Sequence, residues 1–389
     1  MKKKNIAFLI NTLGAGGAER VVSRLGDILQ ERYNISILLV DSADMAYTSS
    51  GEILDLGGQG RNYHSRVFHS CLRIRRIIKE KEIECVISFL PVPNLINLIF
   101  TPRIRRIISI RGYGEGADAS SMKNRLCRLL YKKADWVVAV SEEIREKYIT
   151  DYGIGENRIK AIANPYNVKQ IEKLTGEKVE KTVLDFMEAH ECAATMGRLI
   201  EGKGCQYLLE SLSLLLKKRE GAGLIVIGSG PYEKTLRELA DQLGVAESVL
   251  FLGQQSNPFK YLRLSRLYVS ATLSEGFPNA LVEAMACGIP VIQTDCRSGP
   301  GEILREGFRP DRVKECEKAD YGILIPDFEP VKEDRNRVRQ YEEALARVWE
   351  EMLRDGELAA FYGEKARERA MQFSEERCME QYIGVIENE

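Results

Sequence analysis

The chain has 389 residues, a formal net charge of −1, 44% hydrophobic and 29% charged residues. That length exceeds the usual size of one hydrophobic core, so two globular domains are expected. The charge is unevenly placed. Residues 1–165 hold 26 Lys and Arg against 18 Asp and Glu, a net of +8, whereas the remainder holds 30 against 39, a net of −9. A basic front half indicates an anionic partner on that side.

The cysteine and histidine content indicates which kinds of metal and catalytic site the chain is not expected to contain. Nine cysteines are scattered without a C-x-x-C pair, which favours a reducing compartment and argues against zinc. The chain has only three histidines, which argues against a metal or catalytic centre built from imidazole groups. The N-terminus leads directly into a strand, without the apolar region of a signal peptide, and the longest charge-free stretch, Cys85–Pro102, is interrupted by prolines and asparagines. The sequence predicts a cytoplasmic protein without a membrane span.

Short β-branched runs alternate with helical patterns, which is typical of parallel sheets with crossover helices. In the front half the predicted strands are Asn5–Asn11, Ile35–Asp41, Glu84–Leu90, Arg106–Arg111, Trp136–Ser141 and Arg158–Ala163. In the second half they are Cys192–Gly197, Gly223–Gly228, Ser248–Gly253, Leu267–Ala271, Ile289–Thr294 and Gly322–Ile325. We therefore expect two doubly wound α/β domains, with a cleft where the carboxyl ends of their sheets face each other.

The expected domain boundary follows from a turn-forming string. Asn164–Asn167, with the polar stretch that follows it to Glu188, is predicted to be the linker, and a helical pattern begins at Glu333. The first domain is thus predicted at residues 1–165 and the second at 166–372. A C-terminal helix, at about 373–389, could pack back onto the first domain.

The first glycine-rich segment, Gly14–Arg20, follows the first predicted strand. It resembles a dinucleotide-binding loop but lacks its third glycine, because Glu19 stands at that place. Small residues such as Gly16 and Gly17 still allow a ligand to approach the backbone.

A second loop, Met196–Gly204, also follows a predicted strand and precedes a helix. Arg198 and Lys203 leave from it, so both cationic groups can converge on a diphosphate. The alternative is an ordinary basic loop without a ligand.

The most specific segment is Ser274–Ile292, which reads SEGFPNALVEAMACGIPVI. Asn279 is predicted to N-cap a helix beginning at Ala280, so that the free N–H groups of Asn279, Ala280 and Leu281 and the helix dipole suit a phosphate. Glu275 lies just outside this helix end and Glu283 one turn inside it. The alternative is that Glu283 only favours the helix dipole and Glu275 is a solvated loop residue.

With these three segments the chain resembles glycosyltransferase family 4. The E-x7-E spacing of Glu275 and Glu283 resembles the signature of that family, and the glycine loop and the Gly197–Gly204 string match it too. The resemblance implies the two-domain GT-B architecture, a nucleotide-sugar donor and retention of anomeric configuration. It also implies that the reaction requires neither a cofactor nor a metal ion. The absence of any Asp-x-Asp pair in the sequence fits metal independence.

The resemblance also implies roles for individual residues. Arg198 and Lys203 would hold the diphosphate and stabilise the leaving group, Glu283 would bind the ribose hydroxyls, and Glu275 would act at the donor sugar. Backbone groups around Gly276 and Phe277, with those of Asn279, Ala280 and Leu281, would complete the phosphate cradle. Gly228 and Gly253 are predicted to line the base pocket, and Gly16 and Gly17 the front-domain wall of the donor site.

The acceptor side departs from the family pattern. Where the family often carries His-Gly, this chain has Arg111-Gly112, so Arg111 could bind an anionic acceptor or the donor sugar, or be a surface arginine. Glu19 and Arg20 are the other acceptor-side candidates.

The front domain also contains a basic amphipathic stretch, Ser121–Lys133, and three arginines at Arg103, Arg105 and Arg106. The stretch is either a normal helix packed on the sheet or a contact with anionic membrane lipid. Nucleic acid is a poor partner, because no aromatic platform accompanies these cations.

The sequence thus predicts a cytoplasmic, peripherally membrane-associated retaining hexosyltransferase. It would move a hexose or N-acetylhexosamine from a nucleotide sugar, expected to be a UDP-sugar, onto a lipid-linked or oligosaccharide acceptor in capsule, O-antigen or other surface polysaccharide synthesis. The alternatives are a sugar-nucleotide 2-epimerase of the same fold and a non-catalytic nucleotide-sugar-binding protein.

Overall fold

The computed structural model describes residues 3–43, 45–58, 62–113 and 122–388. Tertiary contacts divide the chain into two compact units. Unit 1 comprises Met1–Pro165 together with Glu375–Glu389, and unit 2 comprises Tyr166–Ser374. No helix within the described ranges is long and apolar enough to cross a membrane.

Unit 1 is built on a parallel sheet with the strand order β3-β2-β1-β4-β5-β6-β7. Its strands are β1 (Asn5–Ile10), β2 (Asn34–Leu39), β3 (Glu52–Asp55), β4 (Cys85–Phe89), β5 (Arg105–Ile110), β6 (Trp136–Ala139) and β7 (Ile159–Ala161). Successive side chains of a strand point to opposite faces. In β1, Phe8 and Ile10 belong to one buried cluster and Ala7 and Leu9 to another, so both faces of the sheet are covered.

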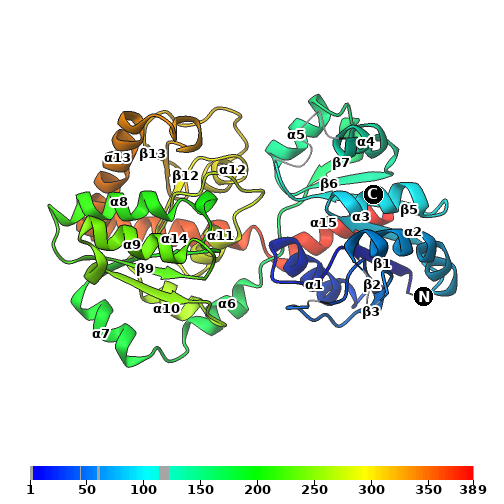
Figure 1. The fold of residues 1–389 in the computed structure, drawn as a ribbon, viewed down its shortest axis with the longest axis horizontal. Helices are drawn as coiled ribbons and strands as arrows, with labels where there is room; N and C mark the ends of the chain where they lie inside the picture. Colours follow the sequence, from blue (N-terminus) through cyan, green and yellow to red (C-terminus); the bar gives the residue numbers. More distant parts are fainter. Residues whose placement is uncertain (1–2, 44, 59–61, 114–121, 389) are drawn as a thin grey trace. The chain divides into compact units, whose positions relative to one another are not determined.

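Different helices cover the two faces of this sheet. Helices α1 (Gly17–Leu29) and α15 (Glu375–Glu387) pack together on one face, and Figure 1 shows the red C-terminal helix among the blue elements of unit 1. The other face carries α2 (Tyr63–Glu80) and α3 (Pro91–Phe100), and α3 packs against both α2 and α4 (Met122–Leu130). Helix α5 (Glu142–Thr150) precedes β7 and packs against it.

Unit 2 has a second sheet with the order β10-β9-β8-β11-β12-β14-β13, parallel except for β13. Its strands are β8 (Glu191–Met196), β9 (Ala222–Ile227), β10 (Val249–Gly253), β11 (Leu267–Ser270), β12 (Val291–Thr294), β13 (Glu317–Lys318) and β14 (Ile323–Ile325). Its main helices are α8 (Cys205–Leu216), α9 (Glu233–Leu243), α10 (Phe259–Leu264), α11 (Asn279–Ala286), α12 (Pro300–Leu304), α13 (Arg335–Arg354) and α14 (Gly356–Met371). The predicted class of two doubly wound Rossmann-like sheets with C-terminal helices is confirmed.

The structure corrects the predicted linker. Two helices, α6 (Val168–Thr175) and α7 (Lys181–Ala189), occupy most of the polar stretch after Asn167. Asn167 caps α6 by accepting a hydrogen bond from the amide of Gln170, and α6 packs against α10 and α11. The stretch is therefore part of unit 2, where Val168, Ile171 and Val183 are buried.

Candidate active site

The loops that carry the predicted donor residues leave the same edge of the unit 2 sheet. Strands β9, β8, β11 and β12 are parallel neighbours, so the segments that follow them lie at their shared carboxyl edge. This edge is where open α/β sheets place their ligands.

Three glycines hold these loops together, backbone against backbone. Gly228 has φ +133°, and a Cβ atom there would lie 1.9 Å from the carbonyl oxygen of Gly197. Gly204 has φ +67°, and its Cβ would lie 1.9 Å from the carbonyl oxygen of Ala271. A Cβ at Gly230 would lie 2.2 Å from the carbonyl oxygen of Leu199. No larger side chain fits without moving backbone, so these loops require glycine.

Lys203 and Glu275 meet at this edge. The Lys203 Nζ lies 2.5 Å from Glu275 Oε1, and Thr272 donates a second hydrogen bond to that oxygen at 3.1 Å. The Glu275 side chain is only 17% exposed. Glu275 is therefore a held carboxylate and not a solvated loop residue.

Arg198 leaves from the same loop as Lys203 but does not join the pair. Its side chain is exposed, and among the described residues it forms no hydrogen bond or ion pair. The loop therefore presents one neutralised cation, Lys203, and one cation in solvent.

Helix α11 begins one residue earlier than predicted. Its N-cap is Pro278, with no side-chain capping bond, so the prediction that Asn279 caps the helix is wrong. The Asn279 side chain instead accepts a hydrogen bond from the Tyr166 hydroxyl at 2.7 Å. The amide of Val282 donates to the Pro278 carbonyl at 3.4 Å, and the amides of Ala280 and Leu281 precede that bond in the first turn.

The remaining predicted residues of unit 2 surround this helix start. Glu283 lies within α11 and is 6% exposed. Phe277 is buried and packs edge-to-face on Phe373, and Gly276 accepts a hydrogen bond from the Ser298 hydroxyl. Gly253 ends β10 with φ +68°, and its carbonyl accepts the Gly228 amide at 2.8 Å, which joins the two loops expected to line a base pocket.

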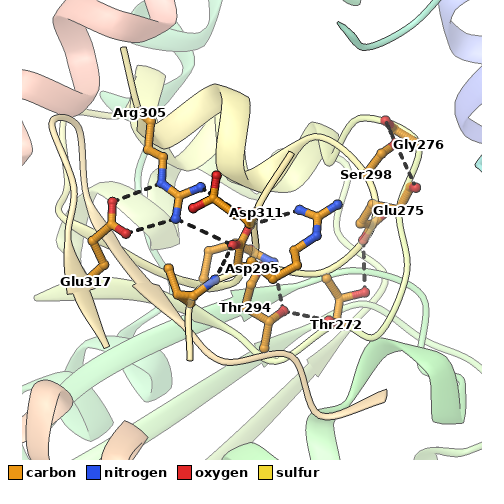
Figure 2. Close-up of polar contacts among 12 residues, drawn as sticks. Thr272, Glu275, Gly276, Thr294, Asp295, Ser298, Arg305, Asp311 and Glu317 are labelled. Atoms are coloured by element: carbon orange, nitrogen blue, oxygen red, sulfur yellow. Dashed lines mark hydrogen bonds and ion pairs between the residues drawn. The ribbon is translucent and has the colours of Figure 1, made fainter. Parts of the chain in front are cut away.

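A network of buried charges lies behind the Glu275 loop (Figure 2). Asp295 is fully buried and accepts from Arg312 at 3.0 Å and from the Val313 amide at 2.9 Å. Arg305 lies 3.7 Å from Asp295 and forms two hydrogen bonds of 2.9 Å with Glu317. No sequence pattern indicated this network, because its partners come together only through the fold.

Burial also sets the protonation of groups near this loop. Burial raises the pKa of Asp327 to about 6. It raises the pKa of the Cys296 thiol well above its ordinary value, so Cys296 does not supply a thiolate nucleophile. In the described part of the chain, no three His, Cys, Asp or Glu side chains gather to hold a metal ion.

The predicted residues of unit 1 lie on the segments that follow its own strands. Gly16 is the N-cap of α1, and Gly17, Glu19 and Arg20 form its first turn. The Glu19 carboxylate folds over Gly16, where an added Cβ would meet it at 2.0 Å.

Arg111 follows β5 and is half-buried. Its guanidinium donates to the Asn164 side chain and, at 3.5 Å, to the Ser109 hydroxyl, and it lies 5.9 Å from the centre of the Phe89 ring. Arg111 is thus anchored by the fold and is not a free surface arginine. Asn164, predicted only as a turn residue, is one of its anchors.

Two seven-stranded Rossmann-like sheets in one chain define the GT-B class of fold. Residues 178–369 match the family described as Glycosyl transferases group 1, and residues 15–170 match Glycosyltransferase Family 4. The chain is 30% identical, over 83% of its length and 84% of the relative's, to an uncharacterized glycosyltransferase of Methanocaldococcus jannaschii. This protein therefore belongs to glycosyltransferase group 1, family 4.

Two further similarities are informative. The chain is 26% identical, over 95% of its length and 96% of the relative's, to the N-acetylgalactosamine-N,N'-diacetylbacillosaminyl-diphospho-undecaprenol 4-alpha-N-acetylgalactosaminyltransferase of Campylobacter jejuni. Its fold is similar to that of Anabaena HepE in complex with UDP, with a TM-score of 0.77, 18% identity and coverage of 99% of this chain and 100% of that one.

Proposed function

We propose that this glycosyltransferase transfers a hexose or N-acetylhexosamine from a UDP-sugar, with retention of configuration and without a metal ion. The acceptor in this proposal is a lipid-linked or oligosaccharide precursor of a surface polysaccharide. The observation that carries the proposal is the pairing of Lys203 with Glu275 beside the first turn of α11.

This arrangement suits a diphosphate leaving group. Lys203, Arg198 and the amides of the first turn of α11 supply positive charge to a developing diphosphate. Glu275 neutralises Lys203 while the site is empty and would face the transferred sugar when Lys203 turns to phosphate. Glu283 would accept hydrogen bonds from the ribose hydroxyls. Glu19, Arg20 and Arg111 remain predictions for the acceptor.

Relatives support the choice of donor and acceptor. The Campylobacter relative is named for a diphospho-undecaprenol acceptor, and another relative, from Staphylococcus aureus, is a capsular polysaccharide biosynthesis glycosyltransferase. HepE was solved with UDP and with UDP-glucose. These names favour a UDP-sugar and a lipid-linked glycan.

Product analysis tests the activity. Nucleotide sugars are screened by thermal shift, where a ligand at 100 times its Kd adds about 2.7 kcal/mol to the free energy of unfolding. The best donor is then incubated with the protein, and products are identified by NMR. We expect slow hydrolysis or transfer with retained configuration, unchanged by EDTA. An epimerised donor, an inverted product, or loss of activity in EDTA that magnesium restores would contradict the proposal.

Unit 1 offers a surface for a lipid-linked acceptor. Helix α4 buries Cys127, but its Met122, Leu126 and Leu129 are 78%, 39% and 69% exposed. These three residues lie at helical spacing and form one apolar stripe. Most of the apolar side of this helix is therefore exposed; Ser121, at the start of the predicted stretch, lies outside the described residues.

The neighbouring helices also expose apolar side chains. Phe68 and Leu72 of α2 and Ile99 of α3 are also exposed, and α3 packs against both α2 and α4. Exposed lysines, Lys123 and Lys133 among them, flank the apolar side chains. Apolar side chains surrounded by cations match an anionic lipid surface, so peripheral binding to the inner face of the cell membrane is part of the proposal.

Two of the three arginines named with the basic stretch, Arg105 and Arg106, are bonded within unit 1. The Arg105 guanidinium donates to the Val385 carbonyl at 2.6 Å and to Asn388, and Arg106 donates to the carbonyls of Leu98 and Lys133. Both guanidinium groups therefore stabilise unit 1. Arg103 remains exposed.

Liposome sedimentation tests the membrane contact. We expect binding that requires anionic lipid and weakens toward 0.15 M salt, where charges are screened within about 8 Å. Met122→Ser with Leu129→Ser, or Lys123→Glu with Lys133→Glu, should each weaken it. Leu264→Ser is the control, because Leu264 is 50% exposed but lies in unit 2. A wild-type protein that ignores anionic vesicles at low salt would refute this contact.

A further inference from the structure

Glu275 lies on a loop, between β11 and α11, that belongs to neither element. A free glutamate side chain samples many rotamers, and ordering it costs up to about 2 kcal/mol. Two residues restrict Glu275: Thr272 contacts its carboxylate, and Ser298 contacts the neighbouring backbone. Neither residue was indicated by the sequence motif.

Thr272 holds the carboxylate. Its hydroxyl has two acceptors within reach, Glu275 Oε1 at 3.1 Å and the Gly202 carbonyl at 3.3 Å. The Gly202 carbonyl already accepts the Leu273 amide at 3.0 Å, whereas a carboxylate is the stronger acceptor. The single hydroxyl proton therefore belongs to Glu275. Thr272 is itself 1% exposed, and its carbonyl accepts the Thr294 hydroxyl at 2.5 Å.

Ser298 holds the backbone on either side of Glu275. The Glu275 amide donates to the Arg297 carbonyl at 2.7 Å, and the Ser298 amide donates to the Glu275 carbonyl at 2.8 Å. The Ser298 hydroxyl donates to the Gly276 carbonyl at 2.8 Å, a contact drawn in Figure 2. Ser298 is fully buried, so water does not compete for these bonds.

The segment that carries Ser298 is fixed at its base. It starts at Asp295, which the buried network with Arg312, Arg305 and the Val313 amide holds in place. Buried ion pairs contribute little net stability, since the loss of hydration offsets the attraction between the charges. Such a network does fix geometry, and here it fixes the segment that contacts Glu275.

We propose that Thr272 and Ser298 are positioning residues that keep Glu275 at the donor sugar after Lys203 turns toward the diphosphate. In the empty site Glu275 has two partners, Lys203 and Thr272. An arriving diphosphate competes for Lys203, because it carries more negative charge than one carboxylate. Thr272 is then the partner that remains. This inference rests on the proposed function, since it takes the diphosphate site from it.

Matched substitutions at Thr272 test the inference. Thr272→Val removes the hydroxyl and keeps the shape, whereas Thr272→Ser keeps the hydroxyl. We expect Thr272→Val to lower kcat about 10- to 100-fold, as for one hydrogen bond to a charged group, with the Kd for UDP within about threefold of wild type. Thr272→Ser should restore kcat to within about threefold. An unchanged kcat in Thr272→Val, or equal losses in both variants, would overturn the role of Thr272.

A second measurement does not depend on activity. Crystal structures of the wild type, Thr272→Val and Ser298→Ala, each with UDP bound so that its diphosphate competes for Lys203, are compared at Glu275. We expect one Glu275 rotamer in the wild type and several rotamers or a shifted loop in the variants. One unchanged rotamer throughout would overturn the inference. A wild-type protein that turns over no nucleotide sugar would refute the proposed function instead, and the crystal structures would still decide the positioning.

Discussion

The two units share a sheet architecture but organise their polar groups differently. In unit 2 the segments after β8, β9, β11 and β12 touch backbone to backbone, and Lys203, Glu275 and Thr272 form a connected set. In unit 1 the outer helices α2 and α4 expose apolar and cationic side chains. The difference teaches that one scaffold can hold a connected set of polar side chains in one unit and expose apolar and cationic side chains in the other.

The largest expected effect concerns the cations of unit 2. Lys203→Ala should lower kcat/KM for the nucleotide sugar about 100-fold or more, because it removes a diphosphate contact and leaves Glu275 without its counter-ion. Arg198→Ala should lower it about 10- to 100-fold, as for one charge-assisted contact. Lys217→Ala, an exposed lysine of the same unit, is the control and should behave as wild type. Wild-type kinetics in both site variants would remove the main distinction between the units.

Next in size is the effect of glycine substitutions on folding, measured by urea denaturation. Gly204→Ala should lower the free energy of unfolding by about 2–4 kcal/mol, because it combines a left-handed φ with an overlap on the Ala271 carbonyl. In unit 1, Gly16→Ala should cost less than about 1 kcal/mol, since only the mobile end of Glu19 must move. Gly202→Ala, with open space around it, is the control within unit 2. Equal losses at positions 16 and 204 would show that the loops of unit 2 are no more constrained than those of unit 1.

The smallest expected effect concerns a buried carboxylate in the helices of unit 2, outside the candidate site. Glu342 of α13 is 3% exposed, lies 3.6 Å from Arg339, and has one oxygen without a hydrogen-bond partner among the described residues. Burial, and next the charge of Glu210, raise its pKa to about 7. As pH rises, the unfolded chain loses this proton near pH 4.5 and the folded chain only near pH 7. The contribution of protonated Glu342 to the free energy of unfolding is therefore fully present below pH 4.5 and is lost as the pH rises through 7.

Glu342→Gln should remove this dependence. We expect a gain on the order of 1–3 kcal/mol in the free energy of unfolding at pH 8 and little change at pH 4. Glu343→Gln is the control, because that neighbour is exposed. Denaturation curves at the two pH values measure the effect, and donor kinetics at pH 8 should not change. A lower free energy of unfolding for Glu342→Gln at pH 8 would contradict this prediction, because it would show that the ionised Glu342 carboxylate stabilises the fold.

Much of the fold was predictable because the buried strands are continuous β-branched runs. The short strands β3 (Glu52–Asp55) and β13 (Glu317–Lys318) were missed, because edge strands with charged ends carry no apolar run. The linker was misplaced because a polar stretch with Val168 and Ile171 buries too few apolar residues to signal a helix.

The candidate site could be proposed from the sequence where its motifs are local. Arg198, Lys203, Glu275 and Glu283 stand on segments whose spacing is read directly from the sequence. Asn279 was misassigned as a cap because Tyr166, distant in the sequence, binds its side chain. Thr272, Ser298 and Asp295 could not be found, since their hydrogen bonds join loops that only the sheet brings together.

The return of helix α15 to unit 1 has a consequence for biosynthesis. Unit 1 is discontinuous in sequence, and Tyr382 and Cys378 of α15 are buried in its core. Unit 2 ends at Ser374 and is complete before α15 has left the ribosome. One face of the sheet formed by the first 165 residues therefore stays partly uncovered until α15 has been synthesised. A chain cut short at residue 374 would keep every unit 2 residue named here and lose a wall of the core of unit 1.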